Sequence, residues 1–173
     1  MNKISLLIVR IVCLGVVACF FSTYFVISCS GLKVNISGME AAFGIDKNDI
    51  PLDPSPMLML IPGIALVVLV ALSIPPVRKK LECAKLPIKN VSIISGIPII
   101  GGITGLILLA NAHYAVIGKV QKEMGGYDIS SIYHTGFGFK ASVFAYIVMF
   151  VMPFVDKMLL KKITSQQNNS ASE

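Results

Sequence analysis

The sequence predicts an all-α membrane protein: a bundle of four transmembrane helices with cytoplasmic N- and C-termini and a small external β element from the two outer loops. Three observations lead to this prediction. Of the 173 residues, 55% are hydrophobic and only 14% are charged, whereas soluble domains carry about a quarter charged residues. Four apolar segments are each long enough to cross a bilayer. The basic residues concentrate in segments that would share one side of the membrane.

The charge distribution sets the expected topology. The segments on the proposed cytoplasmic side hold ten of the fifteen Lys and Arg residues but only three of the nine acids, which is the bias of cytoplasmic loops. We therefore expect a multi-pass protein of the plasma (inner) membrane with both termini cytoplasmic. A single domain, 1–163, would contain spans at about 5–28, 57–75, 91–113 and 137–157. The other segments would be external loops at 30–56 and 114–136 and a disordered cytoplasmic tail at 164–173.

The first apolar segment follows Lys3 and is interrupted only by Arg10. Its continuous part, from Ile11 to Ile27, is at the lower length limit for crossing a bilayer. This places Arg10 near the cytoplasmic interface, where its side chain can extend to water. The alternative is an intramembrane charge that contacts a partner or a lipid headgroup.

The N-terminal segment also has features of a signal peptide, namely a basic start and an apolar core. Val26-Ile27-Ser28-Cys29 resembles a bacterial lipobox, and the residues after it are polar. Cleavage there would make Cys29 the lipidated first residue of a chain with three remaining helices. We expect an uncleaved first helix, with the lipoprotein as an alternative. The four cysteines include no CxxC pair, so we expect no disulfide framework.

The first outer loop begins with alternating apolar and polar residues. Leu32, Val34 and Ile36 are separated by polar residues, which predicts a half-buried strand. The stretch MEAAF, 39–43, predicts a short helical piece, and the proline-rich stretch 46–56 predicts a loop. The three Asp residues of that loop lack the spacing, the central Gly and the closing Glu of an EF-hand, so we expect no metal site.

The second span, 57–74, is rich in Leu, Val and Ala. Pro62-Gly63 is positioned to kink the helix, and Pro75-Pro76 ends it. The basic residues that follow are Arg78, Lys79, Lys80, Lys85 and Lys89. By the positive-inside rule they mark a cytoplasmic loop, and a site for anionic lipid or a partner is the alternative.

The third span, 91–112, is a glycine-rich run of 22 residues without a charge. Gly101 and Gly105 form a small-xxx-small pair, which allows a neighbouring helix to approach closely. We expect this helix to be the central packing element of the bundle. It is also the expected surface for another membrane protein or a second copy of the chain. The expected helix-packing residues are Ser95, Gly101, Gly102 and Gly105.

The second outer loop contains Tyr127, Ile129 and Ser131, which offer a second, weakly alternating strand. The stretch ISGMEAAFG in the first loop and ISSIYHTGFG in the second each end in Phe-Gly. This pattern suggests a short internal duplication of two helical hairpins. The fourth span, 137–155, ends before Asp156 and a group of lysines.

Three motifs resemble those of small bacterial four-helix membrane proteins of unknown function. They are VISCSG at 26–31, ISGMEAAFG at 36–44 and TGFGF at 135–139. This resemblance implies no activity. The layout is also similar to that of claudin-type tetraspan proteins, with both termini inside and a longer first external loop that carries strands. That similarity concerns architecture only, because the claudin first loop has a Trp-containing motif and this chain has no Trp.

The sequence lacks the recognisable groups that catalysis beside a membrane requires: paired acids, a His with a nucleophile, or a metal cluster. We therefore expect no catalytic residue, cofactor or metal site. The sequence also has no arginine-rich or aromatic-interleaved surface of the nucleic-acid-binding kind, so we expect no binding to nucleic acid. The expected function is that of a non-enzymatic subunit, assembly factor or scaffold of a membrane complex. The alternative is a small oligomeric pore or carrier, which Ser92, Ser95 and Thr104 could line.

Overall fold

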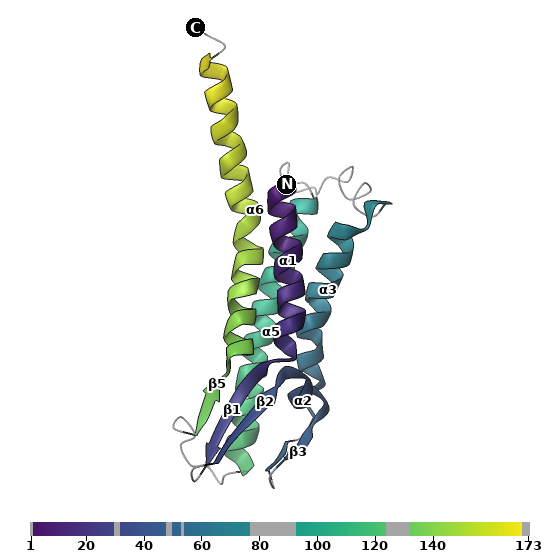
Figure 1. Ribbon diagram of the computed structural model, residues 1–173, viewed down its shortest axis with the longest axis vertical. Coiled ribbons are helices and arrows are strands. Elements are labelled where there is room, and N and C mark those ends of the chain that lie inside the picture. Colours follow the sequence, from purple (N-terminus) through teal and green to yellow (C-terminus); the bar gives the residue numbers. More distant parts are fainter. Residues whose placement is uncertain are drawn as a thin grey trace.

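The computed structural model describes residues 2–29, 32–47, 50–52, 54–76, 93–123 and 132–170. Within this part of the chain, four helices are long and apolar enough to cross a membrane, as the sequence predicts. They are α1 (Lys3–Phe20), α3 (Leu60–Ser73) with the 3₁₀ helix η1 (Pro56–Met59) before it, α5 (Ile93–Glu123) and α6 (Phe137–Ser170). Figure 1 shows these helices in one bundle, with the strands gathered at one end.

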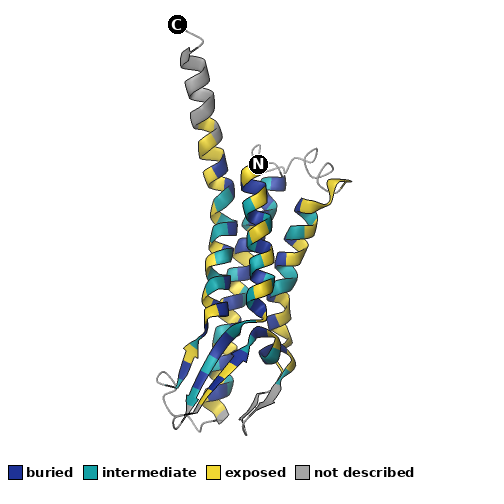
Figure 2. Ribbon diagram, in the orientation of Figure 1, coloured by how far each residue is buried: buried dark blue, intermediate teal, exposed yellow. Residues whose placement is uncertain are grey.

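Each helix of the bundle has two main neighbours. α1 packs against α3 and α6, and α5 packs against the same two helices. Residues of α1 that recur every three or four positions form its buried face, which includes Leu6, Val9, Cys13, Val16 and Phe20. The other side of α1 is also apolar but exposed (Figure 2). A helix that is apolar all round is typical of a membrane span.

The first helix is shorter than the predicted span 5–28, because the last part of that segment is a strand. α1 ends at Phe20, and Thr23–Cys29 forms strand β1. Its sequence, TYFVISC, is rich in aromatic and β-branched residues, which favour strands. The segment is apolar because the strand is covered by the bundle. Its buried side chains are Tyr24, Phe25 and Ile27.

β1 is the central strand of a three-stranded antiparallel sheet with the order β2-β1-β5. β2 (Leu32–Ser37) confirms the strand predicted in the first outer loop, and it buries Val34 and Ile36. β5 (Tyr133–Thr135) comes from the second outer loop. The residues predicted to form the second strand, 127–131, lie outside the described residues. The small sheet thus draws on both loops, but its central strand occupies the predicted end of the first helix.

After β2 the chain forms α2 (Gly38–Phe43), the short helix predicted from MEAAF. A capping box fixes its N-terminus. The Ser37 hydroxyl accepts a hydrogen bond from the Glu40 N–H, and the Glu40 carboxylate accepts one from the Ser37 N–H at 2.8 Å. The direction in which α2 leaves the sheet is therefore set by its N-cap, Ser37, and by Glu40 in its first turn.

The proline-rich stretch that follows contains a short hairpin. β3 (Ile45–Lys47) and β4 (Ile50–Leu52) pair antiparallel as a two-stranded sheet. The prediction of a loop over 46–56 is therefore wrong in part. Pro51 is compatible with β4 because both strands of a hairpin are edge strands, where a missing N–H can face away from the partner.

α5 and α6 continue past the predicted ends of their spans. α5 runs on from 113 to Glu123, and α6 runs on from 157 to Ser170. The prediction of a disordered tail over 164–173 is wrong as far as Ser170, where the helix ends. The residues of α6 after Asp156 include no Gly or Pro that would end the helix. Figure 1 shows this part of α6 extending past the other helices.

We predict that Gly105→Ala destabilises the bundle. A Cβ at Gly105 would overlap the ring of Tyr146 on α6, and overpacking of this kind costs about 1–3 kcal/mol. Gly118→Ala is the matched control on the same helix, because its Cβ would meet nothing within 4 Å. Thermal unfolding in detergent should show a lower Tm for Gly105→Ala and an unchanged or higher Tm for Gly118→Ala. Equal effects of the two changes would contradict this packing.

Candidate functional site

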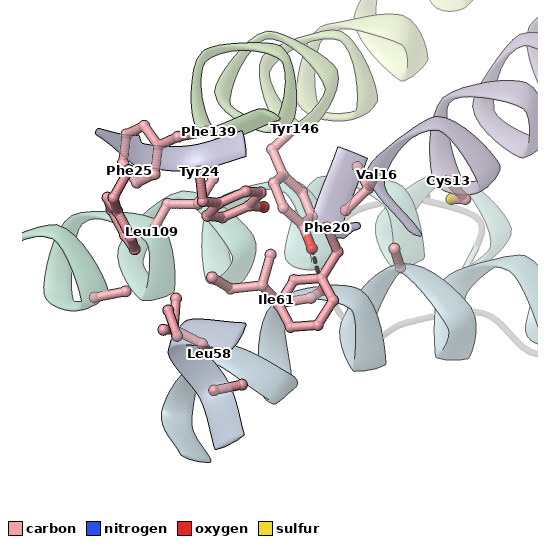
Figure 3. Close-up of a cluster of buried hydrophobic side chains, with 14 of the residues drawn as sticks. Cys13, Val16, Phe20, Tyr24, Phe25, Leu58, Ile61, Leu109, Phe139 and Tyr146 are labelled. Carbon is pink, nitrogen blue, oxygen red and sulfur yellow. Dashed lines mark hydrogen bonds between the residues drawn. The ribbon is translucent and has the colours of Figure 1, made fainter. Parts of the chain in front are cut away.

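Six ring side chains join the sheet to the helices at the strand-bearing end of the bundle. We call this set the aromatic junction: Phe20, Tyr24, Phe25, His113, Tyr133 and Phe139. Centroids of contacting rings lie 5.5–5.9 Å apart, a spacing at which tilted and edge-to-face pairs are favourable. Part of the junction is visible in Figure 3. Because the rings come from three helices and two strands, the junction fixes the sheet to the bundle.

Two hydrogen bonds accompany these rings. The hydroxyls of Tyr24 and Ser142 lie 2.7 Å apart in the buried interior, and the Tyr133 hydroxyl lies 3.1 Å from Nδ1 of His113. Burial raises the pKa of Tyr24 to about 12, although the hydrogen bond to Ser142 opposes the shift. Tyr24 is therefore a neutral hydroxyl at physiological pH and links β1 to α6.

Beside the junction, a hollow of about 730 Å³ opens between the end of α1, the sheet and α2. We call it the outer groove. Its apolar rim consists of Phe21, Met39 and Phe43, which are 62%, 43% and 60% exposed. Its remaining lining is polar or small: Ser22, Thr23, Asn35, Ser37, Glu40 and Gly44. Aromatic and Met side chains exposed together are typical of a protein-binding surface.

The backbone around the outer groove is held by several contacts. Ala41 and Ala42 form part of the buried side of α2, and the Ser55 N–H donates to the Ala41 carbonyl at 3.1 Å. Gly38 lies against Phe20, since a Cβ at Gly38 would be 2.6 Å from that ring. These contacts hold α2 against the end of the bundle, and Met39 and Phe43 on α2 stay exposed.

The predicted helix-packing glycines lie on the face of α5 that is buried in the bundle. A Cβ at Gly101 would lie 2.6 Å from Val68 of α3, and a Cβ at Gly102 would lie 2.9 Å from the backbone of α6. Ser95 is half-buried. A side chain added at Gly101 or Gly102 would therefore collide with a helix of the same chain.

Tyr146 of α6 fills the space at Gly105 and is completely buried. Its hydroxyl donates to the Ile61 carbonyl of α3, as the dashed line in Figure 3 shows. One side chain therefore connects α5, α6 and α3. The sequence predicts packing glycines on α5, but nothing in it marks Tyr146 as their partner.

A second hollow, of about 490 Å³, lies between α3 and α5. Its lining is almost entirely apolar: Leu60, Gly63, Ile64, Val67, Val68, Ile97, Ile100, Gly101 and Thr104. Ser95 and Thr104, two residues expected to line a pore, are nine positions apart and therefore lie roughly 180° apart around the helix. They do not form one polar stripe. The third such residue, Ser92, lies outside the described residues.

At the opposite end of the bundle, two charged side chains bind helix ends. The Asp156 carboxylate of α6 accepts hydrogen bonds from the Asn2 N–H at 2.9 Å and the Ser5 hydroxyl at 2.8 Å. It thereby caps the N-terminus of α1. Arg10 donates from Nη2 to the Leu72 carbonyl near the end of α3. The sequence indicates a special position for Arg10, because it is a charge within an apolar run. Asp156 is only the first charge after a predicted span, and nothing in the sequence predicts its contact with α1.

The structure locates the remaining predicted site residues as follows. Cys29 ends β1, opposite Leu32 of β2. Across the residues that the structure describes, no group of three or more His, Cys, Asp or Glu side chains could hold a metal ion. The residues of the predicted basic loop lie outside that part of the chain: Arg78, Lys79, Lys80, Lys85 and Lys89.

No protein-family model, curated protein or solved structure matches this chain. The resemblance to small bacterial membrane proteins and the claudin-like layout therefore stay predictions.

We predict that Tyr24→Phe and Ser142→Ala each lower the free energy of unfolding by about 1 kcal/mol or more. Each change removes one of the two buried hydroxyls and leaves the other without its hydrogen-bond partner. The double variant should lose less than the sum of the two single losses. Tyr114→Phe, at an exposed tyrosine of α5, is the control and should have little effect. Strictly additive losses in this double-mutant cycle would show that the two hydroxyls do not interact.

Proposed function

We propose that this chain is a multi-pass membrane protein that acts, without catalysing a reaction, as a subunit or scaffold of a membrane complex. The observation that carries the proposal is the outer groove, where three large apolar side chains are exposed on a backbone that other contacts hold in place. Contiguous exposed apolar groups on a folded surface mark interaction sites. A partner would bury its own apolar side chains between Phe21 and α2.

The position of the outer groove favours a partner that is itself a membrane protein. Phe21 directly follows α1, and α2 packs against η1 at the start of α3. The groove therefore lies at the ends of two helices that are apolar enough to cross a membrane. We propose a plasma-membrane location with both termini cytoplasmic, because basic residues concentrate on that side of the chain. The groove would then face the outside.

A partner bound to the third helix would use the exposed side of α5. A Cβ added on the glycine face would meet α3 or α6, so these glycines pack within the chain, although Gly101 also lines the apolar hollow between α3 and α5. The exposed large side chains of α5 include Ile100, Ile103, Ile107 and Tyr114. Self-association through α5 would therefore rest on these residues.

The two alternative functions have less support. A pore would need a polar stripe, and Ser95 and Thr104 lie on different sides of α5. A lipoprotein attached through Cys29 would lose α1 and most of β1. That loss would remove Tyr24 and Phe25 from the core. We therefore retain the subunit or scaffold as the proposed function.

We predict that Phe43→Ser reduces binding of the native partner at least about tenfold, since truncation of an aromatic residue that an interface buries costs about 2 kcal/mol or more at a hot spot. Phe137→Ser is the matched control, because Phe137 is 75% exposed but does not line the outer groove. The readout is the amount of each protein that co-purifies with the tagged full-length chain after extraction in mild detergent. Equal recovery with both variants would contradict the proposal.

A photo-crosslinking amino acid at position 43 provides a direct test of contact. The proposal predicts a crosslinked product with one protein partner, and no such product from position 137. A crosslink to lipid alone at position 43 would mean that the apolar rim is immersed in the bilayer surface, and it would overturn the role of the groove in partner binding.

A further inference from the structure

Arg10 carries a positive charge in the apolar part of α1, and the described part of the chain does not neutralise it. The side chain is half-buried. Nη2 donates to the Leu72 carbonyl, whereas Nε is covered and has no hydrogen-bond partner. Within the described residues no carboxylate bonds to the guanidinium. A charge held in an apolar environment without a counter-charge is costly.

The bond to Leu72 has a cause in the sequence. In a continuous helix the Leu72 carbonyl would accept from the N–H of residue 76, and the Ala71 carbonyl would accept from that of residue 75. Both positions are proline, which has no N–H. Arg10 supplies the missing donor to Leu72 at the C-terminal end of α3, where a cation also complements the helix dipole.

This bond places the guanidinium at the end of α3, where Ser73 and Ile74 are exposed. If the four helices cross a membrane as proposed, the ends of α3 lie near the boundary between hydrocarbon and headgroups. Lipid phosphates lie at that boundary. A guanidinium group binds phosphate through paired N–H donors, more strongly than it binds a neutral acceptor.

We propose that Arg10 and the C-terminal end of α3 form a binding site for the phosphate of an anionic phospholipid, in the leaflet on the N-terminal side of the bundle. One N–H group is committed to Leu72, and the exposed part of the guanidinium binds the phosphate. A lipid with net negative charge is favoured, because the phosphate of a zwitterionic lipid is partly neutralised by its own ammonium group. The inference rests on the proposed membrane placement but not on the outer groove or its partner.

The test uses the full-length chain in nanodiscs of phosphatidylcholine, alone or mixed with phosphatidylglycerol. Arg10→Gln removes the charge but keeps a polar, hydrogen-bonding side chain at this position. Lys3→Gln is the matched control, because it removes a charge at an exposed position of the same helix. Phosphatidylglycerol should raise the Tm of the wild type and of Lys3→Gln but not that of Arg10→Gln. Native mass spectrometry should show phosphatidylglycerol bound roughly tenfold or more weakly by Arg10→Gln.

Three results would overturn the proposal. One is an equal loss of the phosphatidylglycerol effect in Arg10→Gln and Lys3→Gln, which would indicate general surface charge. Another is the same rise in Tm from inorganic phosphate added to phosphatidylcholine nanodiscs, which would indicate a soluble anion. The third is loss of a co-purifying protein in Arg10→Gln with unchanged lipid binding, which would indicate an acidic residue of a partner.

Two further measurements keep the outcome decisive. If Arg10→Gln does not fold, the wild type in mixed nanodiscs provides the test. The proposal predicts that it retains more phosphatidylglycerol than phosphatidylcholine, and equal retention of the two lipids would overturn it. Arg10→Lys, which keeps the charge but not the planar fork, should bind phosphatidylglycerol with intermediate strength. Failure of every variant to enter nanodiscs would instead contradict the membrane placement on which the inference rests.

Discussion

The close approach of α5 and α6 at Gly102 and Gly105 is the contact on which the rest of the molecule depends. Because Gly105 has no Cβ, the ring of Tyr146 can lie against α5 while its hydroxyl reaches α3. Gly136 connects this contact to the sheet. It is the single residue between β5 and α6, and its N–H donates to the Tyr24 carbonyl of β1 at 2.7 Å. This bond connects the start of α6 to β1, whose first residue, Thr23, lines the outer groove.

The four helices could be predicted because length and apolarity are local properties of each segment. Strand β1 could not. TYFVISC is apolar enough to continue α1, and only its pairing with β2 on one side and the distant β5 on the other makes it a strand. Polar composition likewise predicted a disordered tail after 163, although the absence of Gly and Pro lets α6 continue to Ser170.

The candidate site was less predictable than the fold, because it is assembled from separate segments. Phe21, Met39 and Phe43 are ordinary apolar residues in the sequence, and only the turn after α1 and the capped start of α2 bring them to one exposed rim. Arg10 is visible as a charge in an apolar run, but its acceptor on α3 is set by tertiary packing. Asp156 gives no local signal of its contact with the start of α1. Packing and capping partners of this kind depend on three-dimensional contacts between distant segments. The spacing of small residues on α5, in contrast, is visible in the sequence itself.

The most direct test of the proposed function is the composition of the complex that this chain forms in its native membrane. The tagged full-length chain would be extracted gently, and every protein that survives washing would be identified and quantified. A second membrane protein recovered in stoichiometric amount is the predicted result. Recovery of the chain alone, or only as a homo-oligomer, would contradict its role as a subunit or scaffold of a larger membrane complex.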